Sequence, residues 1–224
     1  MPEQSSPDAP HRAQPSVASP PLLDQSVREF LAALASKTPT PGGGSVAALA
    51  GALAASLAQM AMQYTVGKPQ FAEHRPELVD CIDKLRKASG LLQELVDEDM
   101  AAYAALSPLL KLPEDQRQKN PDYAPTLMAA IRAPEAVGGV AIYILVLCDG
   151  LLNKVSPMLL SDLAIAAALA HATVQAAELN VLVNLRLLGD REQADHFRRT
   201  MNALTVKSDV TWGRVRQHAH QALK

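Results

Sequence analysis

Apolar residues recur with a helical period along most of the chain after residue 23. In residues 24–36, Val27, Phe30 and Leu34 fall on one face behind Asp24, which can accept hydrogen bonds from the first N–H groups of a helix. The pattern therefore predicts a first helix with Asp24 as its N-cap.

The same period predicts five further helices, which glycine and proline residues separate. Pro108 is expected to end the third of the six helices, and an irregularity is expected at Pro134 in the fourth. Residues 112–125 are polar and predict a connector with one short helical turn. No segment requires a strand, so the sequence predicts an all-α fold, an antiparallel helical bundle of about five to six helices. The five further helices are expected at residues 46–66, 76–106, 126–151, 158–188 and 191–222.

Composition supports one helical domain. The chain has 224 residues, of which 48% are hydrophobic and only 4% aromatic, so small and unbranched side chains must fill the core. The formal charge of -2 lacks the basic excess expected of a nucleic-acid or anionic-membrane binder, and neither partner is predicted. Cys81 and Cys148 show no metal or redox spacing, which favours reduced thiols and a cytoplasmic protein.

Two segments bear on targeting. Residues 1–21 contain six prolines and no apolar run, which predicts a disordered tail in front of one domain at 22–224. Residues 44–62 are long and uncharged enough to raise the question of a membrane span. Their Ala and Gly content favours a buried helix with closely packed neighbours, and a membrane-associated protein is the lesser alternative.

Asp99 interrupts an apolar helical stripe, since it lies three residues after Val96 and four before Tyr103. An ionised carboxylate is costly at such a position unless it has a partner. One interpretation is a structural bond from a Lys, Arg or Tyr on the next helix. The other is a general acid or base whose pKa partial burial adjusts.

Asn180 and Asn184 break the stripe of a later helix and share one face. They are either an interhelical amide contact or a pair that binds a heterocycle. Asp162 lies 18 residues before Asn180, or about 27 Å along a helix, so the two cannot share one small pocket within a chain. They serve different ends of a site, or a second subunit brings them together; otherwise Asp162 is a favourable charge near a helix start.

Three glycines, Gly42, Gly43 and Gly44, precede Ser45 at the start of a helix. They form either a cradle of backbone N–H groups for an anion or a close helix crossing. His171 points away from Asp162 and is interpreted as a packing or surface residue. The histidines show no metal-ligand spacing with a thiolate or carboxylate, so no metal site is predicted.

Several of these motifs occur together in one family. The segments 39–48, 67–68, 95–103 and 161–190 resemble the cyclodeaminase and methenyltetrahydrofolate cyclohydrolase family, the unit found as the C-terminal half of formiminotransferase-cyclodeaminase. One departure is Val155-Ser156, where the family usually has Gly-Asn. The resemblance covers the chain from about Leu23 to its C-terminus.

The resemblance implies an enzyme on the N5/N10 one-carbon bridge of tetrahydrofolate, either a cyclodeaminase lyase or a cyclohydrolase. The rival hypothesis is a non-catalytic bundle that keeps only ligand or partner binding. The family implies tetrahydrofolate derivatives as ligands, no cofactor beyond that substrate, and a homodimer or higher oligomer that assembles through its helices. It also implies Asp99 as the catalytic carboxylate, and the expected substrate-binding residues are Gly42, Gly43, Gly44, Ser45, Lys68, Asp162, Asn180 and Asn184.

Overall fold

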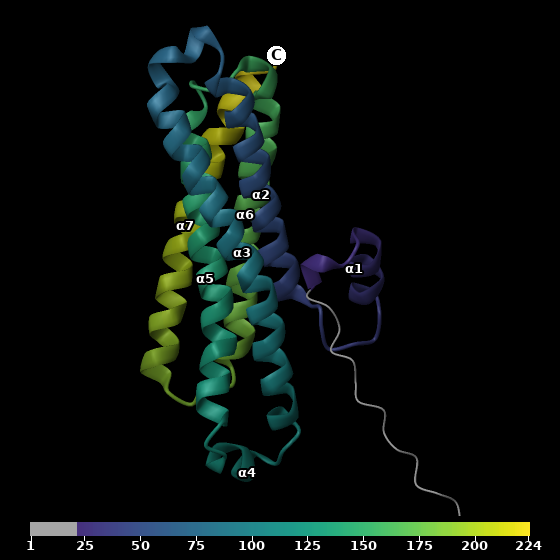
Figure 1. The fold of residues 1–224 in the computed structure, drawn as a ribbon. Helices are drawn as coiled ribbons and strands as arrows, with labels where there is room; N and C mark the ends of the chain where they lie inside the picture. The colour runs from purple at the N-terminus through teal and green to yellow at the C-terminus, as the bar shows by residue number, and fades with distance from the viewer. Residues whose placement is uncertain (1–21) are drawn as a thin grey trace, which may run out of the picture.

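Five long helices form an antiparallel bundle in the computed structural model, which describes residues 22–224 (Figure 1). The expected disordered tail, residues 1–21, lies outside the described residues. No strand occurs in the part of the chain that the structure describes, so the predicted all-α fold is confirmed. The five helices are α2 (Gly43–Val66), α3 (Arg75–Leu110), α5 (Tyr123–Leu151), α6 (Leu160–Leu185) and α7 (Arg191–Ala222).

The helices pack in a fixed order. Helix α2 lies between α3 and α6, helix α5 packs against both α3 and α6, and α7 covers α5 and α6 (Figure 1). Because α2 and α6 run in opposite directions, the first turn of α2 lies beside the C-terminal half of α6. This arrangement brings three segments distant in sequence to one place.

Two short helices and three 3-10 turns complete the fold. Helix α1 (Val27–Leu34) stands apart from the bundle (Figure 1), and α4 (Glu114–Lys119) is the helical turn expected in the connector. The prediction that Asp24 caps α1 is wrong. Ser26 caps it, because Ser26 and Glu29 form a reciprocal capping box, while Asp24 lies in a 3-10 turn. The 3-10 turns are Leu22–Asp24, Pro69–His74 and Pro157–Leu159.

The helix end expected at Pro108 does not occur there, and the irregularity expected at Pro134 does not interrupt its helix. Helix α3 continues through Pro108 to Leu110, and α5 continues through Pro134. Pro108 lies in the last turn of α3, where the missing N–H removes only one bond next to an end that frays in any case. With 36 residues, α3 is the longest helix.

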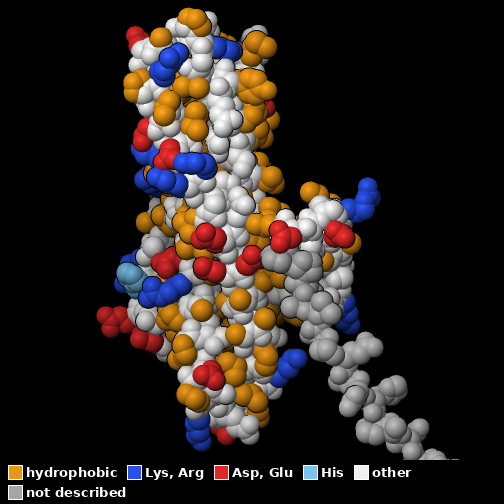
Figure 2. All heavy atoms as spheres, viewed as in Figure 1, with side chains coloured by type: hydrophobic (Ala, Val, Ile, Leu, Met, Phe, Trp, Pro, Cys, Tyr) orange, Lys and Arg blue, Asp and Glu red, His pale blue; other side chains and the backbone are white. Residues whose placement is uncertain are grey.

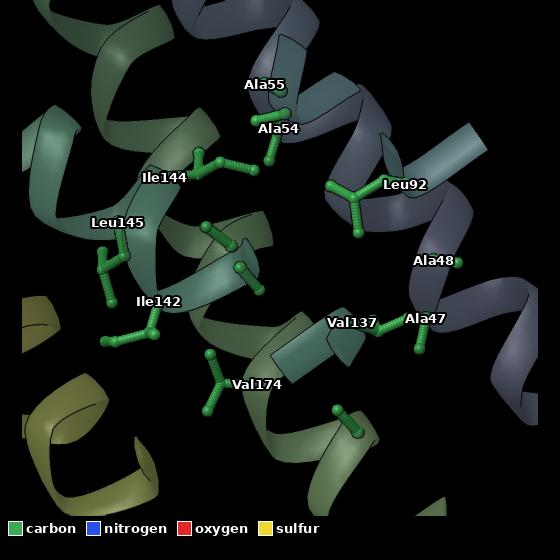
Figure 3. Packing of buried hydrophobic residues seen from close by; sticks show 14 of the residues in the cluster. Ala47, Ala48, Ala54, Ala55, Leu92, Val137, Ile142, Ile144, Leu145 and Val174 are labelled. Carbon is green, nitrogen blue, oxygen red and sulfur yellow. The ribbon is translucent and has the colours of Figure 1, made fainter. Parts of the chain in front are cut away.

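The core depends on the small side chains of α2. All of its alanines except Ala50 are buried in the bundle interior, and Figure 3 shows Ala47 and Ala54 on the side that faces Val137 and Ile144 of α5. A Cβ at Gly51 would lie 3.0 Å from Leu92 Cδ1, so the helices approach as closely as these residues allow. The buried helix predicted for residues 44–62 is confirmed.

Three helical stretches of the described chain have the length and composition to span a membrane: Gly43–Val66, Tyr123–Leu151 and Pro157–Leu185. In the first two, 56% of the most apolar window is buried within the bundle, and in the third 39% is buried. The remaining apolar surface of α6 includes Leu179, which is 68% exposed. Hydrophobic side chains also appear on the face shown in Figure 2, among scattered charges.

Candidate active site

The Asp99 carboxylate lies against the first turn of α2. The Ser45 hydroxyl donates a hydrogen bond to Asp99 Oδ2 over 3.1 Å, and the Ser45 backbone N–H also bonds the carboxylate. Ser45 is buried, and Asp99 is half-buried. The expectation of a partner from Lys, Arg or Tyr is therefore wrong, because the unpaired N–H groups of a helix N-terminus serve a carboxylate equally well.

The glycines make room for polar side chains from two other helices. A Cβ on Gly44 would lie 1.9 Å from Asp99 Oδ1, and a Cβ on Gly43 would lie 3.2 Å from Asn180 Oδ1. The glycine run thus forms a close crossing, and a carboxylate of the chain itself lies at the helix start that was expected to receive an external anion, where it bonds the Ser45 N–H. Gly42 is the N-cap of α2 and makes no comparable contact.

Two opposing effects set the proton affinity of Asp99. Burial raises the pKa of its carboxyl group, and the two bonds from Ser45 lower it by a smaller amount. The net pKa lies above the ordinary aspartate value. A half-buried carboxyl group with a raised pKa suits general acid and base chemistry, because it holds and releases a proton closer to neutral pH.

Asn180 and Asn184 have different surroundings although they share a helix face. The Asn180 amide nitrogen donates to Ala176 O of its own helix over 3.0 Å, and its Oδ1 faces Gly43. The Asn184 amide nitrogen donates to Ala130 O of α5 over 2.7 Å. Asn180 therefore belongs to the Asp99 site, whereas Asn184 makes the interhelical contact that was its alternative interpretation.

Lys68 and Asp162 lie at the other end of the bundle. The distance along α2 from Gly44 to Val66 is about 33 Å, and Lys68 follows this end. Asp162 lies in the first turn of α6, where its charge favours the helix dipole. The structure therefore separates these two residues from Asp99 within one chain.

A polar contact at this far end was missed by the sequence analysis. The Lys68 ammonium donates to Ser156 Oγ over 2.7 Å, and the Ser156 backbone N–H donates to Thr65 Oγ1 over 3.2 Å. Ser156 is only 2% exposed. In the sequence, the only feature that pointed to this contact was the departure from the family pattern at Val155-Ser156. Ser156 is the residue that accepts the hydrogen bond from Lys68 and orients it.

The remaining candidate groups take no part in the site. His171 stacks on Trp212 with ring centroids 5.9 Å apart, and its Nδ1 lies 2.8 Å from Ser208 Oγ, so the packing interpretation is confirmed. Burial raises the pKa of the Cys148 thiol to about 12, so this thiol is unreactive. Within residues 22–224, no three His, Cys, Asp or Glu side chains gather as a metal site would require.

Comparisons with known proteins agree with the motifs. The sequence profile of the family described as formiminotransferase-cyclodeaminase matches residues 26–203. A methenyltetrahydrofolate cyclohydrolase of Methylorubrum extorquens is 28% identical over 83% of this chain and 91% of its own length. A mouse formimidoyltransferase-cyclodeaminase is 34% identical over 78% of this chain, which corresponds to 34% of the mouse protein.

A solved structure extends the agreement to the fold. The crystal structure of formiminotetrahydrofolate cyclodeaminase from Thermotoga maritima superposes with a TM-score of 0.84 and 26% identity, over 91% of this chain and 100% of that one. The sequence match and the shared fold cover the helices that carry Asp99, Ser45 and Asn180. The chain therefore belongs to the formiminotransferase-cyclodeaminase family.

Proposed function

We propose that this protein is an enzyme of folate one-carbon metabolism that acts on the bridge between N5 and N10 of tetrahydrofolate. The observation that carries the proposal is the half-buried Asp99, whose pKa is raised and whose carboxylate lies beside Asn180 at the first turn of α2. The names of the relatives support the substrate class.

Two reactions fit this site. In the cyclohydrolase reaction, Asp99 takes a proton from water as the water attacks the methenyl carbon. The bond from that carbon to N5 breaks, Asp99 returns its proton to N5, and the second water proton leaves as the formyl group forms on N10. The nearly full-length match to a cyclohydrolase favours this reaction.

In the cyclodeaminase reaction, N10 attacks the carbon of a protonated formimino group on N5. Asp99 takes the N10 proton and delivers it to the departing nitrogen, so ammonia leaves and the methenyl cation remains. The fold shared with a cyclodeaminase favours this reaction. Both reactions exchange bonds at a carbon whose oxidation state does not change, and they require only proton transfer from the protein, so we propose no cofactor beyond the folate itself.

The binding roles follow from the free hydrogen-bonding atoms. Asn180 uses its amide nitrogen within α6, which leaves Oδ1 beside Gly43 to accept a bond from a ring N–H of the substrate. The Lys68 ammonium rests on a neutral hydroxyl and suits a substrate carboxylate. Asp162 lies at the same end of the bundle as Lys68 and would bind a polar group there.

A second copy of the chain would complete the site. Two apolar stripes on the neighbouring helices α2 and α6 include Leu53 at 55%, Ile165 at 52%, Leu179 at 68% and Val183 at 54% exposure. We propose that two copies pack these stripes together across a two-fold axis with antiparallel helices. This arrangement places Lys68 and Asp162 of one copy near Asp99 of the other.

The absorbance of the methenyl group tests the function directly, because this species is the product of one reaction and the substrate of the other. Purified protein and the Asp99→Asn variant would receive formimino- and methenyltetrahydrofolate in turn, at a pH where spontaneous conversion is slow. Protein-dependent gain identifies a cyclodeaminase, and accelerated loss identifies a cyclohydrolase. A wild-type protein inactive on both would contradict the proposal and favour the non-catalytic alternative.

A further inference from the structure

Ser45 was expected to bind substrate, but the structure gives it another partner. Its side chain is fully buried, with 0% exposure, and its hydroxyl donates to Asp99 Oδ2. Its backbone N–H bonds the same carboxylate. A hydroxyl that is buried and already donates its only proton is poorly placed to contact a ligand.

The surrounding residues restrict the Asp99 carboxylate to one place. Gly44 faces it so closely that any side chain there would overlap Oδ1. Ser45, the next residue of α2, donates a hydrogen bond to Oδ2. The carboxylate thus lies between a residue without a side chain and a residue with two donors. A reacting group that is held in this way loses little further freedom when substrate binds.

The bonds from Ser45 also oppose the effect of burial. Burial disfavours the charged form of Asp99, and hydrogen bonds to the carboxylate favour it. Removing the hydroxyl would therefore raise the pKa of Asp99 further. A proton carrier works best when its pKa lies near the working pH, so the balance between these two effects matters for the rate.

We propose that Ser45 is a positioning residue for Asp99, which fixes the orientation and the protonation of the carboxylate and makes no contact with substrate. This inference rests on the proposed function, because it concerns the same site.

The test is the Ser45→Ala variant, studied by the pH dependence of kcat and KM for the reaction that the wild-type protein catalyses. Ser56→Ala is the matched control, since Ser56 lies on the same helix and its hydroxyl bonds Ala52 O and Ser89 instead. We expect kcat to fall about tenfold with KM unchanged, and the limb that Asp99 controls to move to higher pH. The Ser56→Ala control should match the wild type in kcat, in KM and in the position of the pH limb.

A rise in KM with an unmoved pH limb would overturn the inference, because it would make Ser45 a substrate ligand. The Asp99 carboxyl carbon can also be titrated by NMR in the wild type and in Ser45→Ala, which needs no turnover. An identical titration midpoint in both proteins would likewise overturn the inference. If the wild-type protein instead converted neither folate, the proposed function itself would fail, while the NMR titration would still report on Ser45 and Asp99, so the two failures are distinguishable.

Discussion

Asn184 supplies the hydrogen bond that Pro134 cannot make. In an α-helix the N–H of residue 134 would bond the carbonyl of residue 130, but proline has no N–H. Ala130 O instead accepts from the Asn184 amide nitrogen over 2.7 Å. This contact explains why α5 runs without interruption through Pro134 and ties α5 to α6 beside the site.

A double-mutant cycle tests this relationship. Asn184→Ala leaves the Ala130 carbonyl without a donor and should lower the free energy of unfolding by about 1–3 kcal/mol. In a Pro134→Ala background the restored N–H should satisfy that carbonyl, so the same substitution should cost much less. Chemical denaturation measures all four proteins. Additive effects of the two substitutions would contradict the assignment.

Gly44→Ala should inactivate the enzyme, because a Cβ at this position displaces the Asp99 carboxylate. A displacement of about 1 Å at a reacting group costs about 100-fold in rate. The matched control is Gly90→Ala in α3, where a Cβ meets nothing within 4 Å. The control should keep full activity and gain up to about 1 kcal/mol of stability, since alanine favours helix over glycine. If Gly44→Ala were as active as Gly90→Ala, the close approach of Gly44 to the Asp99 carboxylate would not be needed for activity.

Asp99→Asn should stabilise the fold while it abolishes turnover. The folded-state pKa of Asp99 is raised, so the folded protein holds this proton more tightly than the unfolded chain. Stability from this group is therefore full at low pH and falls as pH rises through the raised pKa. Asparagine carries no charge, so the Tm advantage of the variant should be larger at pH 7 than at pH 3.5. Thermal unfolding across this pH range measures the difference in Tm between the variant and the wild type. A difference that shrinks with rising pH would contradict the raised pKa of Asp99.

Lys68→Ala should raise KM for the folate about tenfold, with kcat nearly unchanged, because we assign Lys68 to binding a substrate carboxylate. Lys87→Ala is the control, since Lys87 is exposed and pairs with Asp83 on the same helix. Ser156→Ala should raise KM by a smaller factor, because Lys68 keeps its charge but loses its anchor at Ser156 Oγ. Unchanged KM in the Lys68 variant would remove this residue from the site.

Mixed oligomers test whether the site is shared between two copies. Asp99→Asn and Lys68→Ala chains would be unfolded together and refolded as a mixture, then compared with each variant refolded alone. The assay uses substrate well below the wild-type KM, where the raised KM leaves the Lys68 variant nearly inactive. If each site takes Asp99 from one copy and Lys68 from the other, half of the sites in hybrid dimers are intact, and about a quarter of wild-type activity returns. Activity equal to the mean of the two separate variants would mean that Asp99 and Lys68 of the same chain serve one site, or that the two residues do not serve the same site.

The sequence predicted the long helices well because each carries its own periodic stripe and its own breaks. Single residues near helix ends were less predictable. Asp24 and Ser26 are both good caps, and only the reciprocal bond to Glu29 selects Ser26. Pro108 was expected to stop α3, but a proline in the last turn costs too little to do so.

The sequence could single out polar residues on apolar helix faces, but it could not predict their contacts. Asp99 and Asn180 could be recognised because each places a polar group on an apolar face. Their partners could not, because Ser45 is 54 residues from Asp99 in the sequence and only the packing of α2 on α3 brings the two together. The same holds for Lys68 and Ser156, which are 88 residues apart.

The glycine run at the start of α2 has a consequence for the orientation of a bound ligand. Because the Asp99 carboxylate lies against Gly44 and bonds the Ser45 N–H, its charged form repels negative charge from solution at this end of the helix. We therefore expect a folate to present its uncharged ring system here, with its carboxylates directed away from the glycines. The orientation of the ligand therefore depends on the Asp99 side chain, which reaches the helix start because Gly44 has no side chain.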